Sequence, residues 1–216
     1  MLHFKERSDD GLLITFCGLD GCGKTTLIRM LDIYLRDAGY DVLLAKQPTE
    51  AVRRSPIFRT FMDCPDNSAY DYRSLSLFAA SDRVQHVSSV ILPALAEGKI
   101  VLSDRYFYSC LANLRARGYI NDQWIYEIAG CLPAPDAAFF LDVDINTSLS
   151  RVRARSGEKE KWIDIPLQYR LREEYLRMGH EDGILISSDK NPSDTFQYIL
   201  EYVKPLLSIQ KERIAT

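Results

Sequence analysis

The chain lacks the sequence features of membrane-spanning, disulfide-rich and repetitive proteins. Its apolar runs, such as residues 91–96, are far shorter than the ~18 residues that a membrane-crossing helix requires. Its five cysteines form no CxxC pair, and their odd number argues against a disulfide framework. No internal repeat, low-complexity tract or linker divides it. We therefore expect residues 1–216 to form a single soluble, cytoplasmic domain with no membrane partner.

The chain also has little excess charge and few histidines. It carries 27 basic and 30 acidic residues, which give a formal net charge of −3. This balance provides no overall field to attract a nucleic acid polymer. The three histidines, His3, His86 and His180, show no metal-ligand spacing and no nucleophile partner. Any anion binding must therefore be local, and neither a histidine metal centre nor a catalytic triad is predicted.

The most informative segment that is present satisfies the pattern G-x-x-x-x-G-K-[ST] and lies between a predicted strand and a predicted helix. Glycines at these positions allow backbone N–H groups to point inward at an anion, and the helix start adds the positive end of its dipole. We expect Lys24 to reach the β- and γ-phosphates of a nucleotide and Thr25 to contact Mg²⁺. The predicted nucleotide-binding residues are Gly18, Leu19, Asp20, Gly21, Cys22, Gly23, Lys24, Thr25 and Thr26.

The order of apolar segments predicts an α/β fold. Five short apolar runs are predicted as strands, at 12–17, 42–45, 99–103, 137–141 and 183–187. Helical spacing or composition predicts helices after the loop and up to Gly39, through 58–62, and over 70–97, 108–117, 123–131, 148–155, 168–178 and 195–207. In the longest of these, Pro93 predicts a kink and Gly98 the end. The alternation predicts a five-stranded parallel sheet with helices on both faces, and ligands at the carboxyl ends of the strands.

Three charged positions near the predicted ligand edge suggest chemistry. Asp104 ends an apolar strand, where a carboxylate is well placed to hold Mg²⁺ through water, and Arg105 should face the same cleft. The alternative is a structural Asp–Arg pair at the strand end. Asp20 lies beside the phosphate positions, where we expect it to contact a substrate hydroxyl or a magnesium-bound water; the alternative is a turn-forming residue before Gly21.

Two further segments carry clustered charge. Asp82 and Arg83 follow Phe78 on a predicted helix and could form a wall for a base and its phosphate, or a plain ion pair on the helix surface. Three arginines at alternating positions precede a stretch rich in Gly, Glu and Lys, and this region, about 151–164, is predicted to be a basic lid that closes over phosphates. The alternative is a solvated, charged helix end.

Together these motifs resemble the thymidylate kinase family, P-loop enzymes that move the γ-phosphate of ATP onto dTMP. The resemblance covers nearly the whole chain. It rests on the loop 18–26, on Pro48 after the second strand, on 77–83, on 104–106 with Ser109, on 132–136, and on the lid from Arg151 onward.

The resemblance implies ATP and Mg²⁺ as cofactors and a homodimer packed through helices. By position, it implies that the loop binds the ATP phosphates, that Asp20 approaches the acceptor sugar or the magnesium shell, and that Arg83 and Arg105 grip the acceptor phosphate. Because the loop carries Gly21 and Cys22 where some relatives have an arginine, the lid must supply a cation, from Arg155, Lys159 or Lys161. The predicted acceptor-binding residues are Asp20, Pro48, Phe78, Arg83, Arg105, Tyr106, Cys110 and Asn113.

Three positions depart from the family's pattern around the base. The family's stacking phenylalanine lies four residues before the phosphate arginine, where this chain has Ala79 and places Phe78 one residue earlier. Asn113 replaces an aromatic residue, and Cys110 replaces a polar side chain near the pyrimidine edge. These departures leave phosphoryl transfer intact and thymine selectivity open, with Tyr106, Phe107 or Tyr108 as possible compensation.

The predicted mechanism is in-line transfer between two bound nucleotides, with Lys24, Asp20, Arg105 and Arg155 as catalytic groups and Thr25 and Asp104 near Mg²⁺. A kinase for another nucleoside monophosphate is one alternative. A deoxynucleoside kinase is another, with Glu50 as its base. A GTP-dependent switch is disfavoured, because the late strand is followed by Ser187-Ser188-Asp189-Lys190 and not by N-K-x-D.

Overall fold

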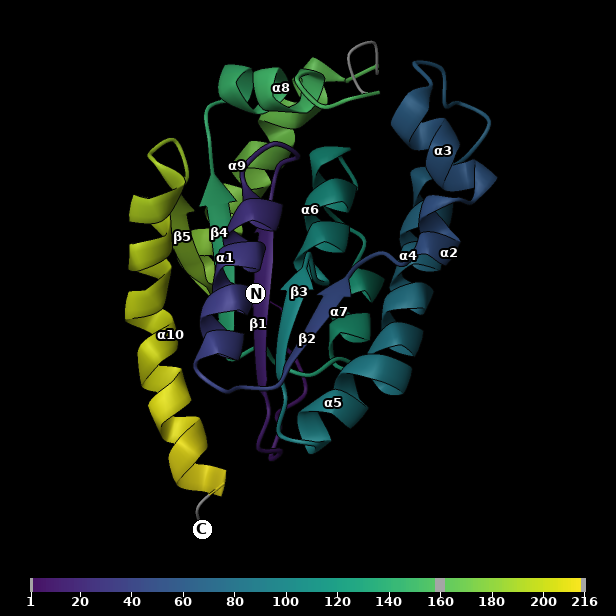
Figure 1. Cartoon of the computed structure of the whole chain (residues 1–216). Coiled ribbons are helices and arrows are strands. Elements are labelled where there is room, and N and C mark those ends of the chain that lie inside the picture. The colour runs from purple at the N-terminus through teal and green to yellow at the C-terminus, as the bar shows by residue number, and fades with distance from the viewer. Residues whose placement is uncertain (1, 158–161, 215–216) are drawn as a thin grey trace.

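The computed structural model describes residues 2–157 and 162–214, and it contains the predicted parallel sheet (Figure 1). The strand order is β2-β3-β1-β4-β5, and every pairing is parallel. The strands are β1 (Leu12–Gly18), β2 (Val42–Lys46), β3 (Ile100–Asp104), β4 (Ala137–Asp142) and β5 (Ile184–Ser187). The strand β1 lies in the centre of the sheet and is buried along its whole length, which explains why its sequence is almost entirely apolar.

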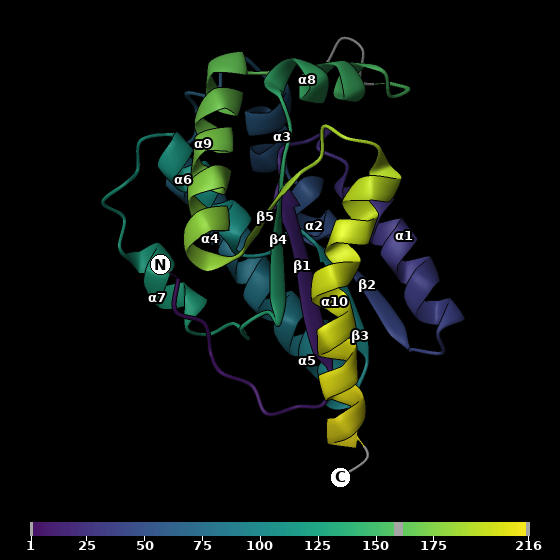
Figure 2. The same ribbon diagram turned by 90° about the vertical axis from the view of Figure 1, so that its left-hand side faces the viewer.

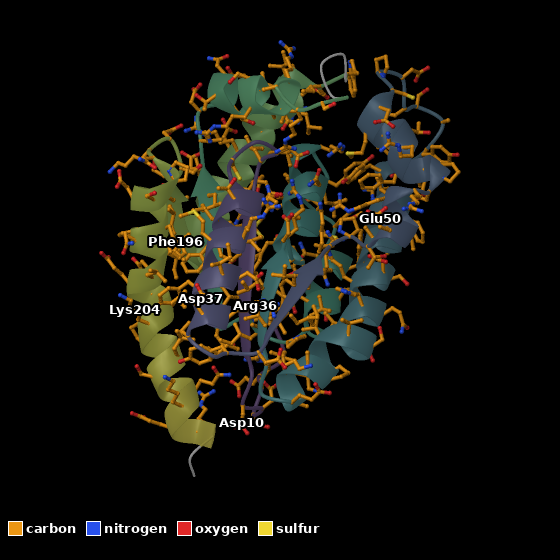
Figure 3. The ribbon with its side chains drawn as sticks, viewed as in Figure 1. Asp10, Arg36, Asp37, Glu50, Phe196 and Lys204 are labelled. Atoms are coloured by element: carbon orange, nitrogen blue, oxygen red, sulfur yellow. The ribbon has the colours of Figure 1, made fainter. Side chains whose placement is uncertain are left out.

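One face of the sheet is covered by α1 (Lys24–Asp37) and α10 (Pro192–Ile214). Leu27, Leu31 and Leu35 of α1 recur at helical spacing and are buried on the sheet. Phe196 of α10 lies between the two helices, with its ring centroid 6.2 Å from that of Tyr34 (Figure 3). Gly39 ends the helical region with a φ of +86°, as the sequence predicts.

The opposite face carries α4 (Tyr72–His86), α5 (Leu92–Ala96), α6 (Tyr108–Ala116), α7 (Trp124–Ala129) and α9 (Ile165–Asp182). Figure 2 shows α9 and α6 side by side on this face, with α10 on the other. A hydrophobic core lies on each face of the sheet. Successive residues of a strand contribute to the two cores in turn, because their side chains point to opposite faces. Leu13 and Phe140 lie in one core, and Ile14 and Phe139 lie in the other.

The carboxyl ends of the strands meet at one edge, where three short helices surround them. Phe16 pairs with Asp104 and Gly18 with Leu141, so the phosphate loop and Asp104 emerge at the same level. The helix α8 (Ile145–Arg153) crosses above this edge (Figure 1), and α2 (Glu50–Arg53) and α3 (Pro56–Asp63) follow β2. This edge is where the sheet topology predicts a ligand.

The long helix expected over 70–97 is divided in the structure. A π-helical turn, η1 (Val87–Ile91), separates α4 from α5. Pro93 has no N–H and its ring crowds the preceding turn, and a π turn is one way for a continuous helix to accommodate this change. Gly98 then ends α5 with a φ of +73°. At the position where a kink was predicted, the structure therefore has this π turn, which ends two residues before Pro93.

The other differences lie at element boundaries. The segment after β2 forms two helices, because Ser55 caps α3 and Pro56 occupies its first turn. The helix expected over 148–155 is α8, which begins three residues earlier. There Asp144 accepts hydrogen bonds from the N–H groups of Asn146 and Thr147. The helices α9 and α10 extend beyond their predicted ranges at both ends.

The residues before β1 are integrated into the fold. Leu2 is buried, and the Phe4 ring packs against those of Tyr106 and Tyr108, tilted and edge to face, with centroid distances of 5.7 and 5.2 Å. Arg7 donates a hydrogen bond to the Asp136 carboxylate, which also accepts one from the Leu13 N–H at 2.7 Å. This segment therefore fastens the amino end of the sheet. Among the described helices, none is both long and apolar enough to cross a membrane.

Candidate active site

The phosphate loop connects β1 to α1 without a side-chain cap on the helix. Gly23 occupies the N-cap position with a φ of +97°, and no side chain accepts a hydrogen bond from the first turn. The backbone N–H groups of this turn therefore remain available to an anion, and the helix dipole favours negative charge there. The loop borders a cavity of about 480 Å³, which we call the donor cavity. Its lining includes Asp20, Gly21, Cys22, Gly23, Lys24, Thr25 and Thr26.

Gly21 lies against α8 so closely that no side chain fits. Its φ is +84°, and a Cβ atom would lie 2.4 Å from the carbonyl oxygen of Ser148. The Ser148 hydroxyl in turn donates to the Asp20 carbonyl at 2.6 Å. The loop and α8 are thus packed backbone to backbone. A cation for the transferring phosphate must therefore come from a position other than 21.

The side chain of Lys24 folds over the loop. It is 6% exposed, and its Nζ donates to the carbonyls of Gly18 at 3.1 Å and Leu19 at 2.7 Å. Nζ also lies 3.6 Å from Cys22 Sγ. These contacts hold the ammonium group at the floor of the donor cavity, and they are neutral partners that an anion can replace.

Asp104 and Thr25 border the donor cavity from two elements. Asp104 is the last residue of β3, and its Oδ2 lies 3.9 Å from Lys46 Nζ, while its buried Oδ1 has no hydrogen-bond partner among the described residues. A buried carboxylate oxygen without a partner suits a metal-bound water or a cation. The described residues contain no group of three or more His, Cys, Asp or Glu side chains that could hold a metal.

Two arginines, one in α8 and one just after it, border the donor cavity. Arg151 Nη1 lies 3.3 Å from the carbonyls of both Gly21 and Ser188, so it ties α8 to the loop and to the turn after β5. Arg155 also lines this cavity. Lys159 and Lys161, the other expected lid cations, lie outside the described residues.

A second cavity of about 190 Å³ lies between α3, α4, α6 and α9, and we call it the acceptor cavity. Helix faces lined by Leu75, Ser76 and Ala79 on one side, and Leu167 and Leu171 on the other, form its apolar walls. The expected acceptor-binding residues that line it are Asp20, Pro48, Arg83, Arg105, Cys110 and Asn113.

Three charged residues line both cavities: Asp20, Arg53 and Arg105. Arg105 has a φ of +70°, and its guanidinium donates to Asp20 Oδ1 at 2.6 Å and to the Tyr175 hydroxyl at 3.0 Å. Arg53 donates to the Pro48 carbonyl at 2.7 Å. We call the wall formed by these three residues the junction. Two cations and one carboxylate meet there, and a phosphate shared between the cavities would lie beside them.

The electrostatics of this junction favour an anion. Burial by itself lowers the pKa of Arg105, but the nearby Tyr175, Asp20 and Asp104 raise it well above its usual value, so the guanidinium stays charged. Burial and the adjacent charge of Arg105 lower the pKa of Arg53. Burial also raises the pKa of Tyr175 to about 12, so its hydroxyl is neutral near pH 7. An incoming phosphate would relieve the repulsion between the two arginines.

Arg83 lies in the acceptor cavity but away from the junction. It is 2% exposed, its Nη1 donates to the Ala79 carbonyl at 2.9 Å, and its Nε has no hydrogen-bond partner within the described part of the chain. It lines the acceptor cavity only. Burial raises the pKa of the neighbouring Cys110 thiol even though Arg83 opposes the shift. Arg83 and Cys110 thus line the acceptor cavity alone, whereas Arg53 lines both cavities.

Two expected acceptor contacts lie elsewhere. Phe78 is 41% exposed on another face of α4, and Ala79 lines the cavity in its place. Tyr106 is fully buried in the core, where its hydroxyl donates to the Pro133 carbonyl at 2.8 Å. The helical rotation of about 100° per residue moves Phe78 off the cavity face. Neither ring belongs to the acceptor cavity as the described residues define it.

Sequence reasoning missed several residues that the fold brings to these cavities. They are Arg53, Tyr72, Arg117, Trp162 and Tyr175. Four of them lie outside the quoted motifs, in α2, in α4, just after α6 and in α9, whereas Trp162 lies within the predicted lid. Only the amphipathic spacing of the helices could have indicated which of their faces turns toward the sheet edge.

The comparisons with known proteins agree with one another. The family described as "Thymidylate kinase" matches residues 16–199. A "Probable thymidylate kinase" of Pyrococcus horikoshii is 39% identical over 171 residues, which covers 78% of this chain and 83% of the relative. A "Thymidylate kinase" of Geobacillus sp. is 33% identical, covering 85% and 91%, and one of Trichlorobacter lovleyi is 31% identical, covering 92% and 99%.

Proposed function

The chain belongs to the thymidylate kinase family, and from that premise we propose that it is a nucleoside monophosphate kinase that transfers the γ-phosphate of ATP to dTMP. The observation that supports this most directly is the pair of cavities that share Asp20, Arg53 and Arg105 as a common wall. Two nucleotides whose phosphates meet at this wall would be positioned for direct, in-line transfer. No covalent enzyme intermediate is needed.

In the proposed mechanism the protein positions the two nucleotides and neutralises charge. The loop N–H groups and Lys24 bind the triphosphate tail in the donor cavity. Arg105 and Arg53 hold the acceptor phosphate at the junction, and Arg105 keeps Asp20 oriented toward the acceptor. Arg155, two residues after the end of α8, lines the same donor cavity and stabilises the transferring group.

Mg²⁺ fits beside Thr25 and the unpartnered oxygen of Asp104. When bound, it would neutralise charge on the phosphates. The residues themselves supply one hydroxyl and one carboxylate, and Asp104 is held in place as the terminal residue of a buried strand. We also propose a homodimer, as the resemblance implies, and a single domain over the whole chain.

A deoxynucleoside kinase is less well supported by the geometry. Such an enzyme needs a base near a free hydroxyl, and Glu50 was the candidate. Its side chain is 67% exposed, pairs with Arg54 Nε at 3.0 Å, and is absent from the described lining of both cavities. The paired arginines at the junction instead suit an acceptor that already carries phosphate.

The experiment that tests the proposal is an acceptor panel with ATP and Mg²⁺. It compares dTMP, dUMP, other nucleoside monophosphates and thymidine, with acceptor-dependent ADP formation as the readout common to all of them. Lys24→Ala should lower kcat by on the order of 10²–10³-fold, while Lys99→Ala, which changes a lysine at the opposite end of β3, should leave it unchanged. Turnover of thymidine in preference to every monophosphate would overturn the proposal.

A further inference from the structure

A third cavity continues the row formed by the donor and acceptor cavities. It measures about 230 Å³, and we call it the outer chamber. It shares with the acceptor cavity the residues Phe61, Tyr72, Arg117, Trp162, Asp164 and Leu167. None of these six residues lines the donor cavity. The acceptor cavity therefore has two ends, one at the phosphate junction and one at the outer chamber.

This order fixes how a nucleotide would lie in the acceptor cavity. Its phosphate belongs at the end bordered by Arg53 and Arg105, because these residues also line the donor cavity. Its base must then point toward the outer chamber. In a pyrimidine nucleotide the ring atoms farthest from the sugar bond at N1 are C4 and its neighbours. Of these, C5 accepts a substituent without altering the hydrogen-bonding groups of the ring.

The wall between the two spaces contains the long side chain of Arg117, which is held by a cation–π contact and by hydrogen bonds to Asn113. The guanidinium carbon of Arg117 lies 3.9 Å from the centre of the Tyr72 ring, and its Nη1 donates to Asn113 Oδ1 at 2.9 Å. A cation–π contact of this kind contributes only about 0.5–2 kcal/mol. By contrast, the Phe61 and Tyr72 rings are packed edge to face at 5.0 Å and are buried. Arg117 is therefore the part of the wall that can move aside.

The chemistry of the outer chamber suits a neutral, hydrogen-bonding group. The residues that line only this chamber, and not the acceptor cavity, are Asn67, Ser68, Tyr70 and Tyr119. All four are uncharged and polar. The two charges in the lining oppose each other, since Arg117 is a cation and Asp164 a carboxylate that caps α9. The volume exceeds by far the roughly 10–15 Å³ that one bound water needs.

We propose that the outer chamber is a subsite for a substituent on the acceptor base. The ligands it fits are pyrimidine monophosphates that carry a neutral, hydroxyl-bearing arm at C5, with Arg117 swinging away from Tyr72 as the arm passes. This inference rests on the proposed function of the acceptor cavity. It adds that the enzyme accepts bases larger than thymine.

The test compares dTMP with 5-(3-hydroxypropynyl)-dUMP, whose rigid arm has a terminal hydroxyl. The wild-type enzyme should use both with kcat/KM values within about tenfold of each other. Asn67→Trp and Ser68→Trp each fill the chamber, so each should lower kcat/KM for the arm-bearing acceptor at least tenfold and leave that for dTMP unchanged. Ala69→Trp adds the same bulk to the same loop at an exposed residue outside the described lining, and should change neither value.

Two outcomes would overturn the subsite. One is rejection of the arm-bearing acceptor by a wild-type enzyme that is active on dTMP. The other is undiminished use of the arm-bearing acceptor by both chamber-filling variants, with their unchanged activity on dTMP showing that each variant is folded. Failure of the proposed function looks different, because the wild-type enzyme would then phosphorylate neither acceptor.

Discussion

At the scale of single residues, the phosphate loop requires glycine at position 21 for two reasons, its backbone conformation and the lack of space for a side chain. Gly21 needs a positive φ, and its missing Cβ leaves space for the Ser148 carbonyl. Gly39 has nearly the same φ, +86°, but nothing lies within 4 Å of a Cβ placed there. The two positions therefore separate backbone strain from a steric clash.

We predict that Gly21→Ala is more damaging than Gly39→Ala. Left-handed backbone strain should cost each variant about 1–2 kcal/mol of unfolding free energy. Gly21→Ala must also displace α8 or the loop, so its KM for ATP should rise while that of Gly39→Ala stays normal. Chemical denaturation and steady-state kinetics measure both effects, and equal KM values would contradict the steric argument.

Arg53 belongs to none of the sequence motifs, and only the fold shows that it lies at the junction. We predict that Arg53→Ala lowers kcat/KM for the acceptor by on the order of 10²-fold, because a charged donor at the phosphate junction is lost. Arg53→Lys should recover only part of this, since lysine lacks the planar fork that binds phosphate with two hydrogen bonds.

The neighbour Arg54 provides a matched control for Arg53. It is 82% exposed and pairs only with Glu50 among the contacts described for its side chain. Arg54→Ala should therefore leave the kinetics unchanged. If both alanine variants behaved alike, the assignment of Arg53 to the junction would be wrong.

At the scale of elements, α4 positions the loop after β2 through one carboxylate. Asp82 Oδ2 accepts a hydrogen bond from the Thr49 N–H at 2.8 Å, and Oδ1 accepts one from the Thr49 hydroxyl. This places Pro48 in the acceptor cavity and aims α2, with Arg53, at the junction. The pair expected at Asp82 and Arg83 is thus divided, with one residue supporting a loop and the other lining the cavity.

We predict that Asp82→Ala raises KM for the acceptor and leaves KM for ATP unchanged. The Thr49 N–H would lose its partner, which costs about 1–3 kcal/mol of unfolding free energy. Ser89→Ala removes only a hydrogen bond between an exposed hydroxyl and the Gln85 carbonyl, so it serves as the control. Acceptor and ATP titrations of each variant provide the measurement, and an equal rise in both KM values would refute a role confined to the acceptor side.

At the scale of the whole molecule, the segment before β1 connects one hydrophobic core to the start of β4. Leu2 and Phe4 pack on one core, and Arg7 connects the segment to Asp136 at the start of β4. The family match begins at residue 16, after this segment. The segment lies at the amino ends of the strands, away from the cavities, so its contribution should be to stability.

We predict that Arg7→Ala lowers the free energy of unfolding by about 1–3 kcal/mol without changing either KM. For a protein of this size, Tm should fall by about 2–4 °C for each kcal/mol lost. Glu6→Ala, at an exposed position, should not shift Tm.

If the chain is a single domain, tryptophan fluorescence and circular dichroism should report the same midpoint for every variant. Trp124 in α7 and Trp162 beside the acceptor cavity lie in different parts of the fold, which makes the fluorescence comparison demanding. Two separate transitions would show that the segment or the lid unfolds independently.

The sequence by itself determined the order of elements, the parallel sheet and the phosphate loop, because apolar periodicity, glycine punctuation and a contiguous motif are local properties of a chain. It also brought Asp20, Asp104, Arg105 and Cys110 to the right edge, since they adjoin the ends of strands or the loop itself. Tertiary structure decided what depends on helix rotation and on contacts between distant segments. It turned Ala79 inward and Phe78 outward, buried Tyr106, gave Arg53 the junction position, and set Arg117 over Tyr72. The physical reason is that one residue's shift turns a helix face by about 100°, and only packing against the rest of the molecule selects which face meets the cavity.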